Sequence, residues 1–546
     1  MKKKLVWLFL FLIIILPYRI KADTISITSD IVLNAYLSTG GDLRLDADIT
    51  LTSDTPVNNE TTLDLNGHTL SMSDKSLISF GPLTIKDTSS NQSGKITGTA
   101  TYIIRVGQSS SEGTLILESG TIDCSAKNYC ITVPSKGTLK VNGGSIISKN
   151  FPIVNTGNTE INGGLVEGTT GGAIYGNTNS TLTLNDGTIR ILSSWEAITL
   201  SRPGAKFIMN GGLVDATADP KGVAIIAFKN TELTINDGEI RASSAGIMGN
   251  GSESGASEGT NAKFTINGGS IISSSIGIYA PQINGETTIS GGLIEAGKTG
   301  IEIRAGNLTM TGGTIKGNLD TFEVKENTSG TNVVGAAIAI VQHTTKKEIN
   351  VNISGGELIS NVSLAEVNPM NNAPEDLAKI SINITNGNFT STSKNTVKID
   401  DFEYMAGKFI SGGTYTNNVT PYVVDTHGER DNADSSVTVL PWRKATTVHD
   451  EDTINIDDKL EGQEVEIHAP EKEGYVIDSI TIICEDGTII TPVDNKFIMP
   501  GTNVAIKVNY KKINNPPTSD NLYLFIGLLI ISILGIIIIN KKRIKA

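Results

Sequence analysis

Charged side chains recur at one position of a repeated phrase, directly after the apolar pair that follows a glycine-rich turn. Carboxylates and a basic residue converging on one face would suit a calcium-dependent polysaccharide lyase, in which Asp binds the cation and Arg or Lys removes a proton. Outward positions of a strand are normally charged, so a solvated stripe is the simpler interpretation. The set comprises Glu167, Asp215, Arg190, Arg241, Glu295 and Lys316.

Two further features bear on carbohydrate chemistry. Asp400 and Asp401 form the only adjacent Asp pair of the repeat region, and glycosidases use paired carboxylates at a defined separation. An ordinary loop is the alternative. Trp195 and Tyr175 stand about one repeat apart, where exposed rings could stack on a sugar and buried rings would simply pack.

Other catalytic signals are missing from the sequence. The histidines lack metal-ligand spacing, and neither a Gly-x-Ser-x-Gly nor a phosphate-binding loop occurs. We therefore predict no catalytic residue, no metal site and no cofactor. Cys124 and Cys130 flank a short segment, and both a small disulfide and two separate buried thiols fit them.

A repeated sequence motif of the form apolar-Asn-Gly-Gly-apolar, as in Leu139–Ile146, must position these residues. Its second Gly falls at positions 144, 164, 187, 212, 238, 269, 292, 313 and 356. A period of twenty-odd residues with strand-like alternation predicts a stacked array. The long last step is predicted to hold two coils, with a degenerate copy around 336–340.

Each coil is expected to contain three short strands: one before the turn, one after it, and one at a motif Ala/Gly-Ile-x-Ile such as Gly300–Ile303. Asn and Gly tolerate the left-handed backbone of a sharp turn. Stacked Asn side chains can then form amide ladders. The prediction for residues 23–420 is therefore an all-β fold, a single-stranded parallel β-helix of roughly sixteen coils and about 75 Å.

The first coils carry a family resemblance. The stretch Leu63-Asp64-Leu65-Asn66-Gly67-His68-Thr69-Leu70 resembles the opening of pectate-lyase-like β-helices in bacterial surface proteins. The resemblance covers most of residues 25–420 and implies a right-handed β-helix. That superfamily holds lyases, glycosidases and non-catalytic adhesins, so the resemblance leaves the activity open.

A different module follows the repeats. Residues 421–444 are predicted to be a connector or cap, and the short alternating strands of 445–512 predict a small antiparallel, sandwich-like β-domain. Gly474-Tyr475, Asp486-Gly487 and Phe497-Ile498-Met499-Pro500 resemble the internalin-B-type repeat of wall-anchored proteins. That resemblance implies a spacer.

The two ends of the sequence predict export. Residues 1–22 have the basic start, apolar run and small final residue of a secretory signal peptide, cleaved between Ala22 and Asp23. Residues 522–539 are apolar and charge-free, which predicts a transmembrane helix, and the basic tail 540–546 stays cytoplasmic. Residues 23–521 are accordingly predicted to be extracellular.

The linker 513–521 precedes the predicted membrane helix. It contains Asn515, Pro516, Pro517, Thr518 and Ser519, and with the apolar span and basic tail it resembles the cell-wall sorting signal of Gram-positive surface proteins. The resemblance implies that a sortase cuts after Thr518 and joins it to an amine of the cell-wall precursor. The commonest signal has Leu and Gly where this chain has Asn515 and Ser519, so the sortase class stays open. A plain membrane anchor is the alternative.

Composition and net charge limit the classes of function and of partner that fit the chain. With 57 Gly and 5% aromatic residues the chain suits a turn-rich repeat, and a net charge of -13 without a basic cluster argues against nucleic acid. The leading hypothesis is a non-enzymatic protein on the cell wall or membrane of a Gram-positive-type bacterium, presenting the β-helix as an adhesin to a host or bacterial glycan or protein. The alternatives are a polysaccharide lyase or glycoside hydrolase on the same scaffold, and an inert surface coat.

Overall fold

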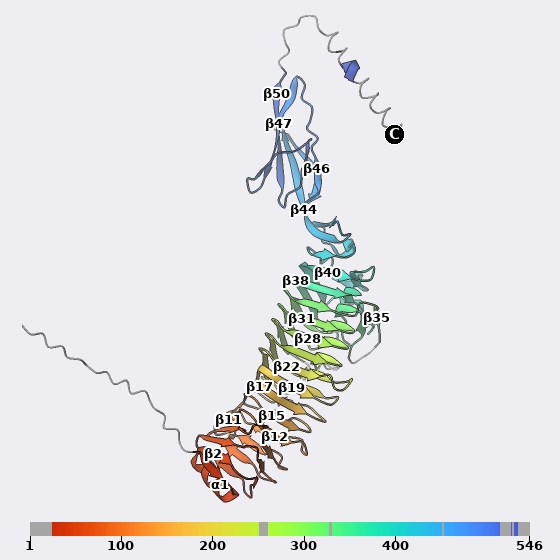
Figure 1. Ribbon diagram of the computed structural model, residues 1–546. Coiled ribbons are helices and arrows are strands. Elements are labelled where there is room, and N and C mark those ends of the chain that lie inside the picture. Colours follow the sequence, from red (N-terminus) through yellow and green to blue (C-terminus); the bar gives the residue numbers. More distant parts are fainter. Residues whose placement is uncertain are drawn as a thin grey trace, which may run out of the picture. The chain divides into compact units, whose positions relative to one another are not determined.

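The computed structural model describes residues 24–250, 260–326, 330–449, 452–513, 526 and 529–532. The chain divides into two compact units between Leu440 and Pro441. Within the first unit, short strands follow one another in stacked coils (Figure 1), and equivalent strands of successive coils pair in parallel. The predicted all-β architecture with long parallel sheets is confirmed, and it is compatible with a β-helix.

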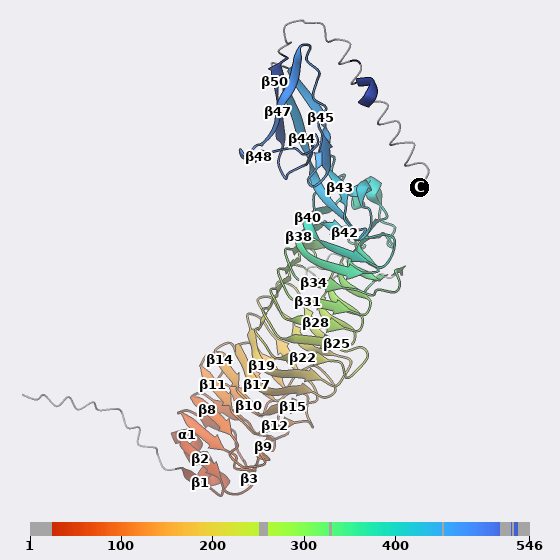
Figure 2. The same ribbon diagram turned by 45° about the horizontal axis from the view of Figure 1, so that its top comes forward.

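Each coil of the first unit contributes strands to two long sheets (Figure 2). The strands before the turn are β1 Ile25–Ile27, β2 Gly41–Leu45, β5 Thr61–Asp64, β8 Pro82–Lys86, β11 Gly113–Leu117, β14 Gly137–Val141, β17 Asn158–Gly168, β19 Thr181–Ile191, β21 Lys206–Met209, β24 Glu232–Ile235, β27 Lys263–Ile266, β30 Glu286–Ile289, β33 Gly306–Met310, β38 Ile349–Ser360 and β40 Ile380–Ser391. Of these, β17, β19, β38 and β40 continue through the turn.

The strands after the turn are β3 Ile49–Thr50, β6 Thr69–Ser71, β9 Lys95–Thr97, β12 Thr121–Cys124, β15 Ser145–Ser148, β22 Leu213–Ala216, β25 Glu239–Ala242, β28 Ser270–Ser273, β31 Leu293–Ala296, β34 Thr314–Lys316 and β42 Thr414–Tyr415.

The third strands form a 14-stranded parallel sheet of their own. They are β4 Thr55–Val57, β7 Leu77–Ser79, β10 Ile104–Val106, β13 Ile131–Val133, β16 Ile153–Asn155, β18 Ile174–Gly176, β20 Glu196–Leu200, β23 Val223–Ala227, β26 Ala245–Gly249, β29 Ile276–Ala280, β32 Thr299–Ile303, β37 Ala336–Ile340, β39 Val362–Glu366 and β41 Val397–Ile399. The three predicted strands per coil are therefore present.

The core is built from columns of β-branched residues in register. Ile225, Ile247, Ile278, Ile301 and Ile338 pair from one third strand to the next, and each is fully buried. β-Branched side chains pack well on a pleated surface, and identical neighbours repeat the same fit in each coil.

The turns form the predicted amide ladder. The Asn162 side-chain amide donates to Asn142 at 2.9 Å, and the Asn185 amide donates to Asn162 at 2.7 Å. The chain of bonds continues through Asn210, Asn236 and Asn267 at 2.8 to 2.9 Å. It starts at the Glu118 carboxylate, which accepts from Asn142, and ends at the Ser290 hydroxyl, which donates to Asn267. Asn therefore ties consecutive coils together by its side chain.

A helix lies between β1 and β2, and the sequence did not predict it. Helix α1 (Asp30–Thr39) packs against β4 and buries Leu33 and Leu37 completely. These two residues are one helical turn apart, so they lie on one face and cover apolar core at this end of the first unit.

The prediction of two coils between Gly313 and Gly356 is wrong. Strand β33 pairs directly with β38, with Gly306 opposite Ile349, so the two belong to neighbouring coils. The extra length forms an insert, residues 317–335, whose short strands β35 (Glu323–Val324) and β36 (Val333–Val334) pair antiparallel. The third strand of this long coil is β37, which contains the sequence 336–340.

The first unit also holds α2 (Pro374–Leu377), the 3-10 helices η2 (Phe402–Tyr404) and η3 (Thr420–Tyr422), and β43 (His427–Asp431). The second unit is a small β-domain with β44 (Val437–His449), which starts before the boundary, β45 (Asp452–Leu460), β46 (Glu464–Glu466), β47 (Tyr475–Cys484), β48 (Ile489–Ile490), β49 (Lys496–Ile498) and β50 (Val504–Lys512). Among its described residues, the strand pairings are antiparallel except that of β44 with β50. Its own core includes Val465, Ile482, Phe497 and Ile506.

Candidate functional site

The predicted stripe of charges is present and in strict register. Glu167, Arg190, Asp215 and Arg241 pair consecutively, Ile272 interrupts the column, and Glu295 and Lys316 continue it on β31 and β34. Arg190 Nε donates to the Glu167 carboxylate at 2.7 Å, and Lys316 lies 3.6 Å from Glu295. The sequence thus predicted both the residues and their stacking.

Each member of this stripe already has a partner. Asp215 accepts bonds from the backbone and hydroxyl of Thr217, and Arg241 pairs with Glu239 at 2.9 Å. Glu295 and Lys316 border a surface depression of about 580 Å³, but they face one another there. A lyase base needs a neutral, unpaired form to remove a proton. The arrangement therefore fits a solvated face of alternating charges.

The Asp400–Asp401 pair adjoins a buried carboxyl that the sequence did not single out. Asp400 is ion-paired with Lys398, while the Asp401 backbone N–H donates to Glu366 at 3.2 Å. Glu366 stands in β39 opposite Ile340, at a place that core Ile occupies in other coils, and is 1% exposed. This burial raises the pKa of Glu366 to about 7. A substrate cannot reach Glu366, and Asp400 of the pair is exposed but ion-paired with Lys398.

Five aromatic side chains, which we call the aromatic stripe, line the side of the third strands; Phe151 is buried, three are half-buried and Trp195 is exposed. They are Tyr102, Tyr129, Phe151, Tyr175 and Trp195. The rings of Tyr102 and Tyr129 stack with centroids 5.6 Å apart. Phe151 meets Tyr175 edge-on at 5.1 Å and Trp195 at 6.3 Å. Trp195 stays 48% exposed. In a chain with few aromatic residues, this concentration marks the face of the third strands.

The coil repeat positions these rings. Tyr102, Tyr129 and Phe151 each stand two residues before the buried Ile that begins their third strand. In the next coil the equivalent residue is Gly172, where an added Cβ would lie only 2.2 Å from the Phe151 ring. Glycine there leaves room for Phe151, which in turn supports Trp195. Of the five rings, the sequence predicted only Tyr175 and Trp195 as a candidate pair. The signal for the other three is an aromatic residue two positions before the Ile that begins a third strand.

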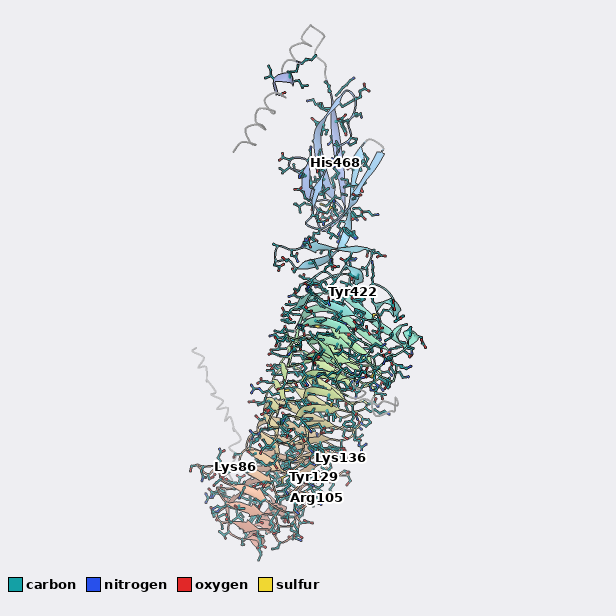
Figure 3. All side chains as sticks on the ribbon, turned by 90° about the vertical axis from the view of Figure 1, so that its right-hand side faces the viewer. Lys86, Arg105, Tyr129, Lys136, Tyr422 and His468 are labelled. Atoms are coloured by element: carbon teal, nitrogen blue, oxygen red, sulfur yellow. A yellow bond between two sulfur atoms is a disulfide. The ribbon has the colours of Figure 1, made fainter. Side chains whose placement is uncertain are left out.

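The aromatic stripe carries polar groups beside its rings. The Tyr175 hydroxyl lies 2.6 Å from the Ser201 hydroxyl. Figure 3 shows Tyr129 between Arg105 and Lys136 along this side of the first unit. Aromatic faces with a hydroxyl beside them offer both apolar contact and hydrogen bonding, the two requirements for holding a sugar ring.

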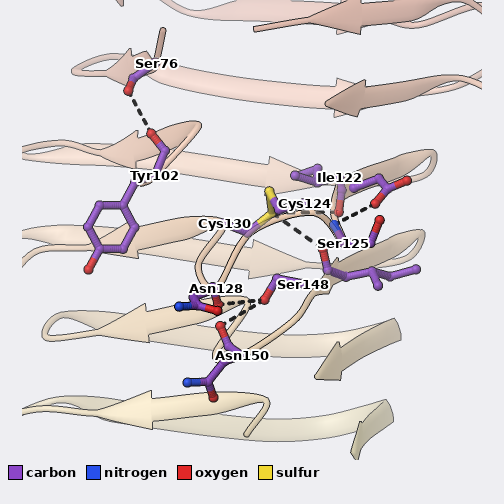
Figure 4. The surroundings of a disulfide bond; sticks show 11 residues. Ser76, Tyr102, Ile122, Cys124, Ser125, Asn128, Cys130, Ser148 and Asn150 are labelled. Atoms are coloured by element: carbon purple, nitrogen blue, oxygen red, sulfur yellow. Dashed lines mark hydrogen bonds between the residues drawn. A yellow bond between two sulfur atoms is a disulfide. The ribbon is translucent and has the colours of Figure 1, made fainter. Parts of the chain in front are cut away.

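A disulfide fixes one end of the aromatic stripe. Cys124 and Cys130 are bonded, with their Cα atoms 5.6 Å apart (Figure 4), so the loop that carries Tyr129 is closed covalently. Of the two interpretations that the sequence left open, the structure contains the disulfide. Cys484 of the second unit is a buried free thiol.

A second group of buried polar residues holds the insert 317–335. The Glu302 carboxylate accepts the backbone N–H groups of Asn332 and Val333 at 2.8 and 3.1 Å. Arg304 donates to Tyr279 and to the Gly330 carbonyl at 3.2 and 2.9 Å. Burial raises the pKa of Glu302 to about 7, although Arg304 acts in the opposite direction. Glu302 is enclosed, so the cluster serves to attach the insert.

The remaining predictions concern metal ligands and the two ends of the chain. Across the described ranges, no cluster of three or more His, Cys, Asp or Glu is arranged to hold a metal ion. Ala22 and Asp23, the sorting residues Asn515–Ser519 and most of the predicted span 522–539 lie outside the described residues. Among the residues that are described, no helix is long and apolar enough to cross a membrane.

Comparison of the chain with protein-family models, with curated proteins and with solved structures found no match.

Proposed function

We propose that this chain is an adhesin of a Gram-positive-type cell surface, and that it binds a glycan along the aromatic stripe. In this proposal residues 23–420 form a right-handed, single-stranded parallel β-helix that offers one long face to the ligand. The observation that carries the binding function is the aromatic stripe, with Trp195 half exposed on a supporting Phe151. Exposed aromatic rings on a rigid scaffold bind at little entropic cost, because their positions are already fixed.

Catalysis is not part of the proposal. The charged residues that a lyase would need pair with neighbouring side chains, and Glu366, whose pKa is raised to about 7, is buried. Binding without chemical conversion therefore agrees best with the arrangement of side chains. Surface location is supported by the signal-peptide pattern of residues 1–22, and anchoring by the sorting-signal pattern around Thr518.

The test is a glycan array probed with the full chain and with Trp195→Ala. Truncating a central aromatic anchor costs about 2 kcal/mol or more, so we expect affinity for the bound glycans to fall at least about tenfold. Trp442→Ala is the matched control, because Trp442 is 38% exposed but belongs to the second unit. Absence of any glycan binding by the wild type would reject the proposal and favour an inert coat. Equal binding by Trp195→Ala would reject the aromatic stripe.

A further inference from the structure

A pocket rich in lysine lies away from the aromatic stripe, in an otherwise acidic chain. Its volume is about 440 Å³, and its lining includes Lys346, Lys347, Lys379, Asn307 and Asn350. It opens at the start of β33 and β38, which belong to the strands before the turn, whereas the aromatic stripe follows the third strands. Three ammonium groups around one cavity contrast with the net charge of -13.

A buried carboxylate holds two of these ammonium groups in place. Asp376 is 7% exposed, and its two oxygens accept Lys346 and Lys379, each at 2.8 Å. Lys379 also donates to the Lys346 carbonyl at 3.3 Å. Each ammonium has three donors, so both keep donor capacity beyond Asp376. The Lys346 backbone is left-handed, with φ +56°, a conformation that elsewhere in this chain is mostly taken by Asn and Gly.

The third lysine has no such partner. Across the described residues no carboxylate is ion-paired with Lys347, which is exposed at the pocket. On the other side of the cavity, the Asn350 amide donates to Asn307 at 2.9 Å and fixes both amide groups. Of the lining residues Glu348 alone is acidic, so the lining, counted with Asp376, keeps a positive balance.

We propose that this pocket binds the acidic group of a glycan, a carboxylate or a sulfate, with Lys347 as the principal cation and Asn307 and Asn350 hydrogen-bonded to sugar hydroxyls. Lys347 has no ion-pair partner among the described residues and can form a charge-assisted bond to an oxyanion, while Lys346 and Lys379, held by Asp376, supply preset donors beside it. The site is separate from the aromatic stripe. It can therefore exist whether or not Trp195 binds a glycan.

The experiment is calorimetric titration of the full chain with three probes: oligogalacturonate for carboxylate, dextran sulfate for sulfate, and neutral dextran. Wild type is expected to bind at least one acidic probe and not the neutral one. Lys347→Gln should weaken that binding about tenfold, the loss of one charge-assisted bond, while Lys347→Arg should retain it. Binding of one acidic probe alone supports the site and identifies the acidic group.

The matched control is Lys394→Gln, which removes one charge from an exposed lysine outside the pocket. If this control weakens binding as much as Lys347→Gln, the attraction is general and the pocket is not a site. Failure of the wild type to bind either acidic probe overturns the proposal, as does unchanged binding by Lys347→Gln. Trp195→Ala leaves this pocket intact. Unchanged binding of the acidic probes by this variant would show that the pocket binds them independently of the aromatic stripe.

Discussion

The chain is expected to lose stability as the pH rises from about 4.5 to about 7. Glu302 and Glu366 are buried, and their pKa values are raised from 4.5 to about 7 in the folded protein. A raised pKa means that the folded state holds its proton when the unfolded state has lost it. This stabilisation is complete below pH 4.5 and is lost as the pH passes through 7. Each carboxyl accounts for about 3 kcal/mol of the free energy of unfolding.

Urea unfolding of the full chain between pH 5 and pH 8, followed by circular dichroism, measures this slope. Glu302→Gln and Glu366→Gln should each flatten it, whereas Glu60→Gln, on an exposed carboxyl, should not. Carboxyls whose pKa is lowered, such as Asp376 with its two lysines, titrate below their usual pKa of 3.8. They therefore do not change the stability between pH 5 and pH 8. Stability that rises toward pH 8, or an unchanged slope in both Gln variants, would show that these carboxyls are not buried as described.

Gly164→Ala should destabilise the first unit by about 3 kcal/mol. Gly164 has φ +78°, and an added Cβ would lie 2.5 Å from the Gly144 carbonyl oxygen in the coil before it. The left-handed backbone alone costs roughly 1–2 kcal/mol for a residue with a side chain. The forced displacement of backbone in a closely packed stack adds a similar amount.

Gly407→Ala separates these two contributions. Gly407 also has positive φ, at +116°, but nothing lies within 4 Å of an added Cβ. Its replacement should therefore show only the conformational cost, and urea midpoints of the two variants should differ clearly. If both variants unfold at the same denaturant concentration, close stacking of the turns does not contribute to the cost of Gly164→Ala.

Local chemistry explains what the sequence predicted well. Asn and Gly recur with the coil period, so turn, amide ladder and strand register follow from one another, as the bonds from Asn142 to Asn267 demonstrate. The column of charged residues could be predicted in the same way. Residues such as Glu167 and Arg190 keep a constant offset from the turn and therefore stack.

Long-range pairing explains what the sequence did not reveal. The number of coils depends on which strands pair, and the bonds between β33 and β38 skip the whole insert. Glu302 has the outward position of its motif, where charge is normally solvated, yet Asn332 and Val333 of the insert cover it. Phe151 could not be predicted as a partner of Trp195, because the two rings become neighbours only when the coils stack.

We propose that the protein is held on the cell surface, and fractionation of cells carrying wild type or Thr518→Ala tests this most directly. If a sortase cuts after Thr518, the wild type is released only by an enzyme that digests the cell wall. Thr518→Ala, which removes the residue joined to the wall, should instead stay in the membrane fraction and dissolve in detergent. Wild-type protein that detergent alone extracts would contradict covalent attachment to the wall, and protein that remains inside intact cells would contradict the surface location.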